Sequence, residues 1–141
     1  MLLRDLSETI IFGENFARKV HSKTVILLKG PIGSGKTSFV QGLAKGLSIK
    51  DDITSPTFAL SHHYSSGKLS LTHMDLYRLN NTLAAQELFL EEYEEIDERG
   101  GVLVVEWPEL ILPVINFYWL IEIEYAEKSG RRYQIFDPKL P

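Results

Sequence analysis

The sequence contains no cysteine. This absence excludes disulfide bonds, thiolate metal sites and a cysteine nucleophile, so the fold must be stabilised by side-chain packing. Long hydrophobic runs are also missing, since no stretch approaches the roughly 20 apolar residues of a membrane-spanning helix. Near the N-terminus, Arg4 and Asp5 stand where a signal peptide needs an apolar core. We therefore expect a cytoplasmic protein without membrane contact.

Positive charge is scarce as well. Fifteen Lys and Arg residues face 19 Asp and Glu residues, which gives a formal net charge of −4. Proteins that hold nucleic acid on their own surface usually carry a clear excess of positive charge. If this chain serves RNA, we expect it to do so through a protein partner.

The chain length bounds the domain organisation. A chain of 141 residues is long enough for one domain with a real core and too short for two of ordinary size. Its hydrophobic share of 44% is ordinary for a globular protein. The sequence thus predicts a single domain spanning residues 1–141.

The most informative stretch is a glycine-rich loop that matches the phosphate-binding pattern G-x-x-x-x-G-K-[ST] at every fixed position. Residues 24–29 before it form an apolar run typical of a buried strand. Residues 38–47 after it repeat apolar side chains every four residues, as a helix does. Strand, loop and helix therefore occur in the order that the pattern requires. The loop and the residue after it are Gly30, Pro31, Ile32, Gly33, Ser34, Gly35, Lys36, Thr37 and Ser38.

The chemistry of phosphate binding explains these residue types. Glycines let successive backbone N–H groups turn inward around an anion, at the positive end of the following helix. Lys36 is placed to reach the outer phosphates, and Thr37 offers a hydroxyl to Mg²⁺. A glycine-rich turn that binds nothing is the alternative, and five fixed positions in the right context disfavour it. The loop predicts binding of a nucleoside triphosphate with Mg²⁺.

Two carboxylates come at the ends of predicted strands. Glu106 ends the apolar strand 102–105, where a buried strand would deliver an acid beside the phosphate loop to hold Mg²⁺ or its water. The alternative is a core strand whose acid merely reaches solvent. Asp75 ends a second strand and precedes Arg78 by three residues. It is either part of the triphosphate site or half of a surface Asp–Arg pair, and we favour the site.

Two hairpins indicate the class of sheet. Period-two alternation predicts strands over 58–64 and 69–75, joined by a turn, and a second hairpin over 118–125 and 131–136. A hairpin is antiparallel, so the sheet cannot be wholly parallel. We expect an α/β fold, a single P-loop NTPase-like domain with a mixed parallel and antiparallel sheet flanked by helices.

Helices are predicted on both sides of the loop. One starts with Ser7 as a hydroxyl cap, and its apolar stripe would pack on the sheet and could border the nucleotide base. A second, over 83–98, carries an acidic outer face that is either merely solvated or docks on a basic partner.

Three other features have two interpretations each. The polar loop 48–56 leads to Thr57 and is either a nucleotide-sensing switch or a solvated connector. The histidines at positions 62, 63 and 73 are either metal ligands or ordinary hydrogen-bonding residues, and we favour the latter. Arg131 and Arg132 follow the last turn, where they could touch the nucleotide.

Four stretches occur together: the phosphate loop at 30–37, Ser-Pro-Thr-Phe at 55–58, His-Met-Asp-Leu-Tyr-Arg-Leu at 73–79, and Glu-Trp-Pro-Glu at 106–109. In this order and spacing they resemble the TsaE (YjeE) family, small bacterial ATPases of the tRNA threonylcarbamoyladenosine pathway. The resemblance runs over nearly the whole chain. Departures from the family's common pattern lie in and just after the phosphate loop, at residues 31, 32, 34 and 38, and after Arg78, at residues 80–82.

The resemblance implies a partner-stimulated, Mg²⁺-dependent ATPase. It would act with the TsaD–TsaB complex, which transfers a threonylcarbamoyl group to the adenosine next to the tRNA anticodon, and would meet tRNA only through that complex. Thr37 and Glu106 would hold Mg²⁺, and Lys36 with the loop amides would hold the phosphates of ATP. Asp75 would orient the attacking water or support the magnesium shell. The remaining nucleotide-site residues would be Thr57 in the switch loop, Trp107 near the nucleotide or partner surface, and Arg131.

Two other function classes share the loop. A small nucleoside or sugar kinase usually closes an Arg-rich lid over the transferred phosphate, and the chain has no room for such an insertion. A GTP-binding switch would need the guanine-reading N-K-x-D pattern and a D-x-x-G switch, which the sequence lacks. The kinase is the alternative that we keep.

Overall fold

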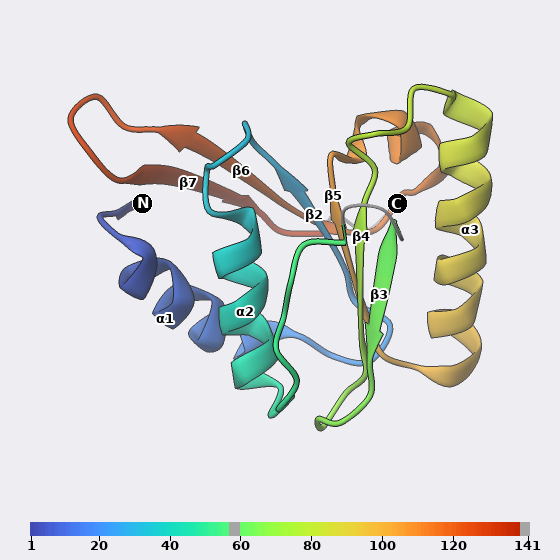
Figure 1. The fold of residues 1–141 in the computed structure, drawn as a ribbon. Coiled ribbons are helices and arrows are strands. Elements are labelled where there is room, and N and C mark those ends of the chain that lie inside the picture. Colours follow the sequence, from blue (N-terminus) through green and yellow to red (C-terminus); the bar gives the residue numbers. More distant parts are fainter. Residues whose placement is uncertain (57–59, 139–141) are drawn as a thin grey trace.

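The computed structural model describes residues 1–56 and 60–138. Within these ranges, seven strands form one sheet (Figure 1). The strands are β1 (Leu2–Leu3), β2 (Val25–Lys29), β3 (Ser61–Tyr64), β4 (Leu71–Asp75), β5 (Val102–Glu106), β6 (Trp119–Tyr125) and β7 (Arg131–Phe136). The helices are α1 (Leu6–Phe16), α2 (Lys36–Gly46) and α3 (Thr82–Arg99), with 3-10 segments η1 (Ala17–Lys19) and η2 (Pro108–Val114).

The sheet is mixed, as the two hairpins predict. Its strand order is β1-β7-β6-β2-β5-β4-β3. The four central strands β6, β2, β5 and β4 run parallel, and β3 and β7 pair antiparallel with β4 and β6. Both hairpins and the α/β fold class are thereby confirmed, and residues 58 and 59 of the first predicted strand lie outside the described residues. The edge strand β1, which pairs with β7, was not predicted, because two residues carry no periodic signal.

Helices cover both faces of the sheet. In Figure 1, α1 and α2 lie on one side and α3 on the other. Of the central strands, β2 and β5 are buried on both faces, which explains their continuous apolar sequences. None of the helices in the described ranges is long and apolar enough to cross a membrane.

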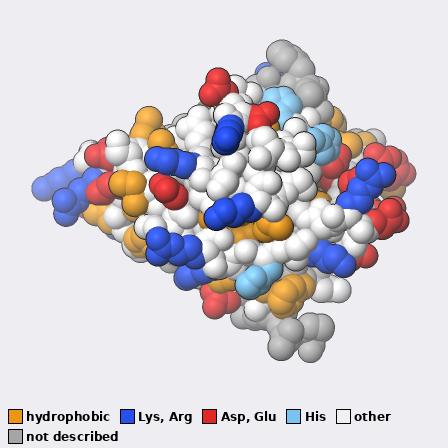
Figure 2. All heavy atoms as spheres, turned by 90° about the horizontal axis from the view of Figure 1, so that it is seen from below, with side chains coloured by type: hydrophobic (Ala, Val, Ile, Leu, Met, Phe, Trp, Pro, Cys, Tyr) orange, Lys and Arg blue, Asp and Glu red, His pale blue; other side chains and the backbone are white. Residues whose placement is uncertain are grey.

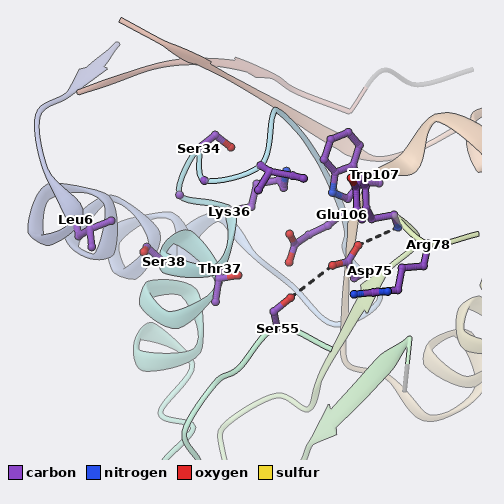
Figure 3. A pocket seen from close by; sticks show the side chains of 14 residues that line it. Leu6, Ser34, Lys36, Thr37, Ser38, Ser55, Asp75, Arg78, Glu106 and Trp107 are labelled. Carbon is purple, nitrogen blue, oxygen red and sulfur yellow. Dashed lines mark hydrogen bonds between the residues drawn. The ribbon is translucent and has the colours of Figure 1, made fainter. Parts of the chain in front are cut away.

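Helices α1 and α2 touch backbone to backbone. A Cβ added to Gly42 would meet the Ile10 carbonyl oxygen at 2.1 Å, and one added to Gly13 would meet the Phe39 carbonyl oxygen at 2.4 Å. Only glycine fits at such a close approach. This contact holds α1 beside α2 and brings Leu6, at the start of α1, to the phosphate-loop end of α2 (Figure 3).

The predicted cap of the first helix was wrong. Asp5, not Ser7, is the N-cap of α1, and its carboxylate accepts a hydrogen bond from the Glu8 backbone N–H at 2.9 Å. Aspartate and serine cap equally well, so the helix starts at the first of the two. The acidic helix is confirmed as α3, with Asn81 as its N-cap.

Candidate functional site

The phosphate loop joins β2 to α2 at the carboxyl end of the central strands. Gly33 and Gly35 have φ angles of 77° and 100°, which residues with a side chain seldom adopt. Gly35 is the N-cap of α2, which begins at Lys36. The positive end of the helix dipole therefore lies at the loop, where it favours an anion.

Lys36 folds over its own loop and is only 6% exposed. Its Nζ donates to the carbonyl oxygens of Gly30 at 2.5 Å and Pro31 at 3.1 Å. The same atom lies 4.2 Å from the centre of the Trp107 ring. Burial lowers the pKa of Lys36, while the nearby Glu106 charge opposes that shift. The ammonium is thus held at the loop, in reach of an anionic ligand.

The two predicted carboxylates are neighbours in the sheet. Asp75 and Glu106 are register partners at the ends of the parallel strands β4 and β5. Because register partners point to the same face, both side chains lie on the side of the sheet that α2 covers. Burial raises the pKa of Asp75, against a hydrogen bond that its carboxylate accepts from the Tyr77 N–H at 3.0 Å. Ser55 Oγ also donates to Asp75, at 3.5 Å.

Glu106 has a buried partner. It is 3% exposed, and its Oε2 is hydrogen-bonded to Nε2 of His73, which is fully buried. The other two strand histidines bond elsewhere: His62 Nδ1 to the Tyr64 hydroxyl at 3.2 Å and His63 Nε2 to Glu92 at 2.7 Å. All three make hydrogen bonds, as the interpretation that we favoured predicts.

Loop, helix and carboxylates surround one pocket of about 470 Å³. Figure 3 shows Lys36 and Thr37 on one side and Asp75, with Arg78 beside it, on the other. The size and the mixed lining suit a small-molecule ligand. The lining residues are Leu6, Ile32, Gly33, Ser34, Gly35, Lys36, Thr37, Ser38, Ser55, Asp75, Tyr77, Arg78, Glu106 and Trp107.

The β6–β7 hairpin packs against the phosphate loop from outside this pocket. Arg131 donates from Nη2 to the Gly33 carbonyl oxygen at 3.2 Å, and its guanidinium lies 4.5 Å from the centre of the Tyr125 ring. The Tyr125 hydroxyl donates to the Ile32 carbonyl oxygen. Arg131 therefore contacts the loop backbone and does not line the main pocket, whereas it lines a smaller cavity of about 120 Å³ with Gly33.

Three contributors to the site had not been singled out from the sequence. The Tyr77 ring packs against the Trp107 ring at a tilt of 43°, with ring centres 4.8 Å apart. Tyr125 holds the loop, and Leu6 lines the pocket. Only Tyr77 had a signal, since it follows Asp75 by two residues at a strand end. Thr57 lies outside the described residues.

Comparisons with known proteins agree with this geometry. A family model described as threonylcarbamoyl adenosine biosynthesis protein TsaE matches residues 3–133. A tRNA threonylcarbamoyladenosine biosynthesis protein TsaE from Synechocystis sp. is 46% identical over 108 residues, covering 76% of this chain and 68% of the relative. The protein of the same name from Nostoc sp. is 38% identical over 136 residues, covering 96% and 83%. The crystal structure of YdiB from Bacillus subtilis superimposes with a TM-score of 0.77 at 30% identity, over 94% of this chain and 80% of that one.

Proposed function

The chain belongs to the TsaE family, and from this membership we propose that it is a Mg²⁺-dependent ATPase that supports threonylcarbamoyl modification of the tRNA adenosine next to the anticodon. The reaction would be hydrolysis of ATP to ADP and phosphate. The observation that carries the proposal is one pocket in which a phosphate loop faces two carboxylates from adjacent parallel strands.

The donors in this pocket suit magnesium. Mg²⁺ prefers oxygen ligands and is usually bound through one or two carboxylates, with water and substrate phosphates completing its shell. The Thr37 hydroxyl and the Glu106 carboxylate supply such oxygens at the pocket wall. Among the described residues, no group of three or more His, Asp or Glu side chains is placed to hold a metal alone. This sparse donor set fits a cation that arrives with ATP, and bound there it would neutralise charge on the phosphates.

Each remaining residue has a proposed task. Lys36 and the backbone N–H groups of the loop would bind the phosphates, with Ser34 and Ser38 at the pocket wall beside them. Asp75 would accept a hydrogen bond from the attacking water or support the magnesium shell, and its raised pKa suits a proton acceptor. Trp107 would cover the nucleotide beside Lys36.

Two nucleotide contacts remain predictions. We expect Thr57 to sense the nucleotide from the loop after Ser55. We expect Arg131 to act near the nucleotide through the loop that it contacts, since its guanidinium donates to the Gly33 carbonyl.

The partner that we propose is a TsaD–TsaB-like complex, with tRNA reached only through it. The net charge of −4 and the mixture of basic and acidic side chains on the underside of the molecule (Figure 2) support this indirect role. The exposed acidic face of α3 is the candidate docking surface. It consists of Glu87, Glu91, Glu94, Glu95 and Glu98.

The test is ATP hydrolysis by the purified protein, alone and with the cognate TsaD–TsaB complex and tRNA. We expect the partners to stimulate hydrolysis, and Glu106→Ala to lower the stimulated rate by about 10²-fold or more while ATP still binds. Glu14→Ala is the matched control, because it removes a carboxylate that pairs with Lys45 on the surface. Equal hydrolysis by Glu106→Ala would overturn the role of Glu106. Hydrolysis indifferent to the partners, with phosphate transferred to a nucleoside or sugar, would instead support the kinase.

A further inference from the structure

We propose that His73 is a positioning residue, which holds the carboxylate of Glu106 in the orientation that binds Mg²⁺. This inference rests on the proposed function, because it assigns a task to a side chain behind the proposed metal ligand. His73 does not line the pocket and would touch neither metal nor nucleotide. It would act only through Glu106.

Strand register places the two side chains together. His73 pairs with Val104, and Asp75, two residues on, pairs with Glu106. All four side chains point to the same face of the sheet, so His73 lies one row behind the two carboxylates. The Glu106 side chain leans back to His73 Nε2 through Oε2. Its other oxygen, Oε1, takes no part in this bond.

The bond between His73 and Glu106 matters because both side chains are buried. Glu106 is 3% exposed and His73 is 0% exposed, so water does not orient the carboxylate on this side. A buried carboxylate without a partner is costly and would turn towards any donor within reach. One strong donor on the pocket side is the Lys36 ammonium, which lines the pocket and whose pKa responds to the Glu106 charge. His73 therefore keeps the carboxylate at the strand end.

The surroundings of His73 indicate which ring nitrogen donates to Glu106. Within the described residues, His73 Nδ1 has no hydrogen-bond partner and is fully buried. A proton on Nδ1 would be an unsatisfied buried donor, whereas a proton on Nε2 is shared with Glu106. A ring with its proton on Nε2 satisfies the pair, so His73 donates and Glu106 accepts. Residues that orient metal ligands in this way commonly contribute about 10- to 100-fold to metal affinity or activity.

The experiment measures the Mg²⁺ dependence of ATP hydrolysis in His73→Leu. Leucine fills a similar volume to the histidine ring but has no hydrogen-bond donor. We expect the Mg²⁺ concentration for half-maximal hydrolysis to rise about 10-fold or more. Titration with Mn²⁺, followed by electron paramagnetic resonance in the presence of a non-hydrolysable ATP analogue, should show the same loss of metal affinity. Affinity for the analogue in EDTA should stay unchanged, because the phosphate loop is intact.

Two variants separate positioning from packing. His73→Gln places an amide N–H within reach of Glu106 and should recover most of the metal affinity. His62→Leu is the matched control, because His62 is the cross-strand partner of His73 on β3 and bonds Tyr64 instead of Glu106. It should leave both titrations unchanged.

A folded His73→Leu protein with the metal affinity of the unsubstituted protein would overturn the inference and leave the proposed function standing. If the unsubstituted protein binds the analogue equally with and without metal, the proposed metal site fails, and the inference fails with it. Should His73→Leu not fold, His73→Gln is compared with His73→Asn, whose shorter amide does not reach Glu106. Equal metal affinity in these two would overturn the inference.

Discussion

The two sides of the pocket are built on different principles. On the acid side, Asp75 and Glu106 are side chains at the ends of paired strands, and the register of β4 and β5 places them. On the phosphate side, the groups that we propose bind the ligand are mostly backbone N–H groups, placed by the conformations of Gly33 and Gly35. Substitutions on the acid side should therefore change metal binding and hydrolysis without changing the shape of the pocket. Substitutions on the phosphate side should change the shape of the pocket itself.

The two sides also differ in how they are supported. The acids stand on a buried sheet, with His73 two residues before Asp75 on the same strand. The loop receives hydrogen bonds from Tyr125 and Arg131, which are 93 and 98 residues away in the chain. The acid side is thus supported by the sheet of which it is part. The phosphate side is supported by the β6–β7 hairpin, which is distant in the sequence.

The largest effect that we expect is loss of nucleotide binding in Lys36→Ala. Removing a buried ammonium that we propose binds the phosphates should weaken ATP binding by about 10²-fold, since truncating one member of a buried charged pair commonly costs about 2 to 5 kcal/mol. Isothermal titration with ATP analogues measures it. Lys29→Ala is the control, because Lys29 lies exposed at the end of β2, and its affinity should not change. If Lys36→Ala bound ATP normally but hydrolysed it slowly, Lys36 would belong functionally to the acid side.

A smaller effect is expected where the hairpin supports the loop. Tyr125→Phe removes the hydroxyl that donates to the Ile32 carbonyl. A neutral hydrogen bond contributes about 0.5–1.5 kcal/mol, so we expect nucleotide affinity to fall by about 2- to 10-fold. The Mg²⁺ dependence of hydrolysis should stay constant, because the acid side is untouched. Tyr118→Phe, which removes a hydroxyl just before β6, is the control. A shift in Mg²⁺ dependence without a change in affinity would contradict the separation of the two sides.

What the sequence could predict follows the same division. The phosphate loop and both acids were predictable, because each depends on a local pattern: a glycine spacing, or an apolar run that ends in a carboxylate. The bonds from Tyr125 and Arg131 to the loop were not, since they depend on how a hairpin twists over residues far away in the chain. The bond between His73 and Glu106 escaped prediction for a related reason. It requires the register of two parallel strands, and no residue type specifies that.

Local ambiguity explains the wrong helix cap and the features for which no prediction was made. Asp5 and Ser7 are equally good N-caps, so the start of α1 could not be chosen from composition. The η2 segment after Trp107 contains Pro113 inside a 3-10 helix, an arrangement that apolar periodicity does not reveal. Trp107 itself has a φ of 57°, unusual for a bulky residue. It follows the last residue of β5 and carries the ring that lies over Lys36.

The smallest effect that we expect is on the free energy of unfolding, and it arises from Asp75 on the acid side. Burial raises the pKa of Asp75 above its ordinary value of 3.8, so the ionised carboxylate is less favourable in the folded protein than in the unfolded chain. Asp75→Asn removes that charge and keeps an oxygen for the Tyr77 N–H. We expect the variant to be more stable than the unsubstituted protein at neutral pH. Asp75 is partly exposed, and water screens it, so the gain should be no more than about 1 kcal/mol.

The destabilisation by ionised Asp75 depends on pH. Above the raised pKa, Asp75 is ionised in both states, and its full destabilising effect is present. As the pH falls through the raised pKa towards 3.8, the folded protein takes up a proton before the unfolded chain does, and the destabilisation disappears. The advantage of Asp75→Asn in urea unfolding should therefore be largest at neutral pH and vanish below 3.8. Asp97→Asn, which removes an exposed aspartate near Lys23, is the control. If Asp75→Asn is instead less stable at neutral pH, the bond from the Tyr77 N–H to the charged carboxylate outweighs burial, and the acid side holds its charge without an energetic cost.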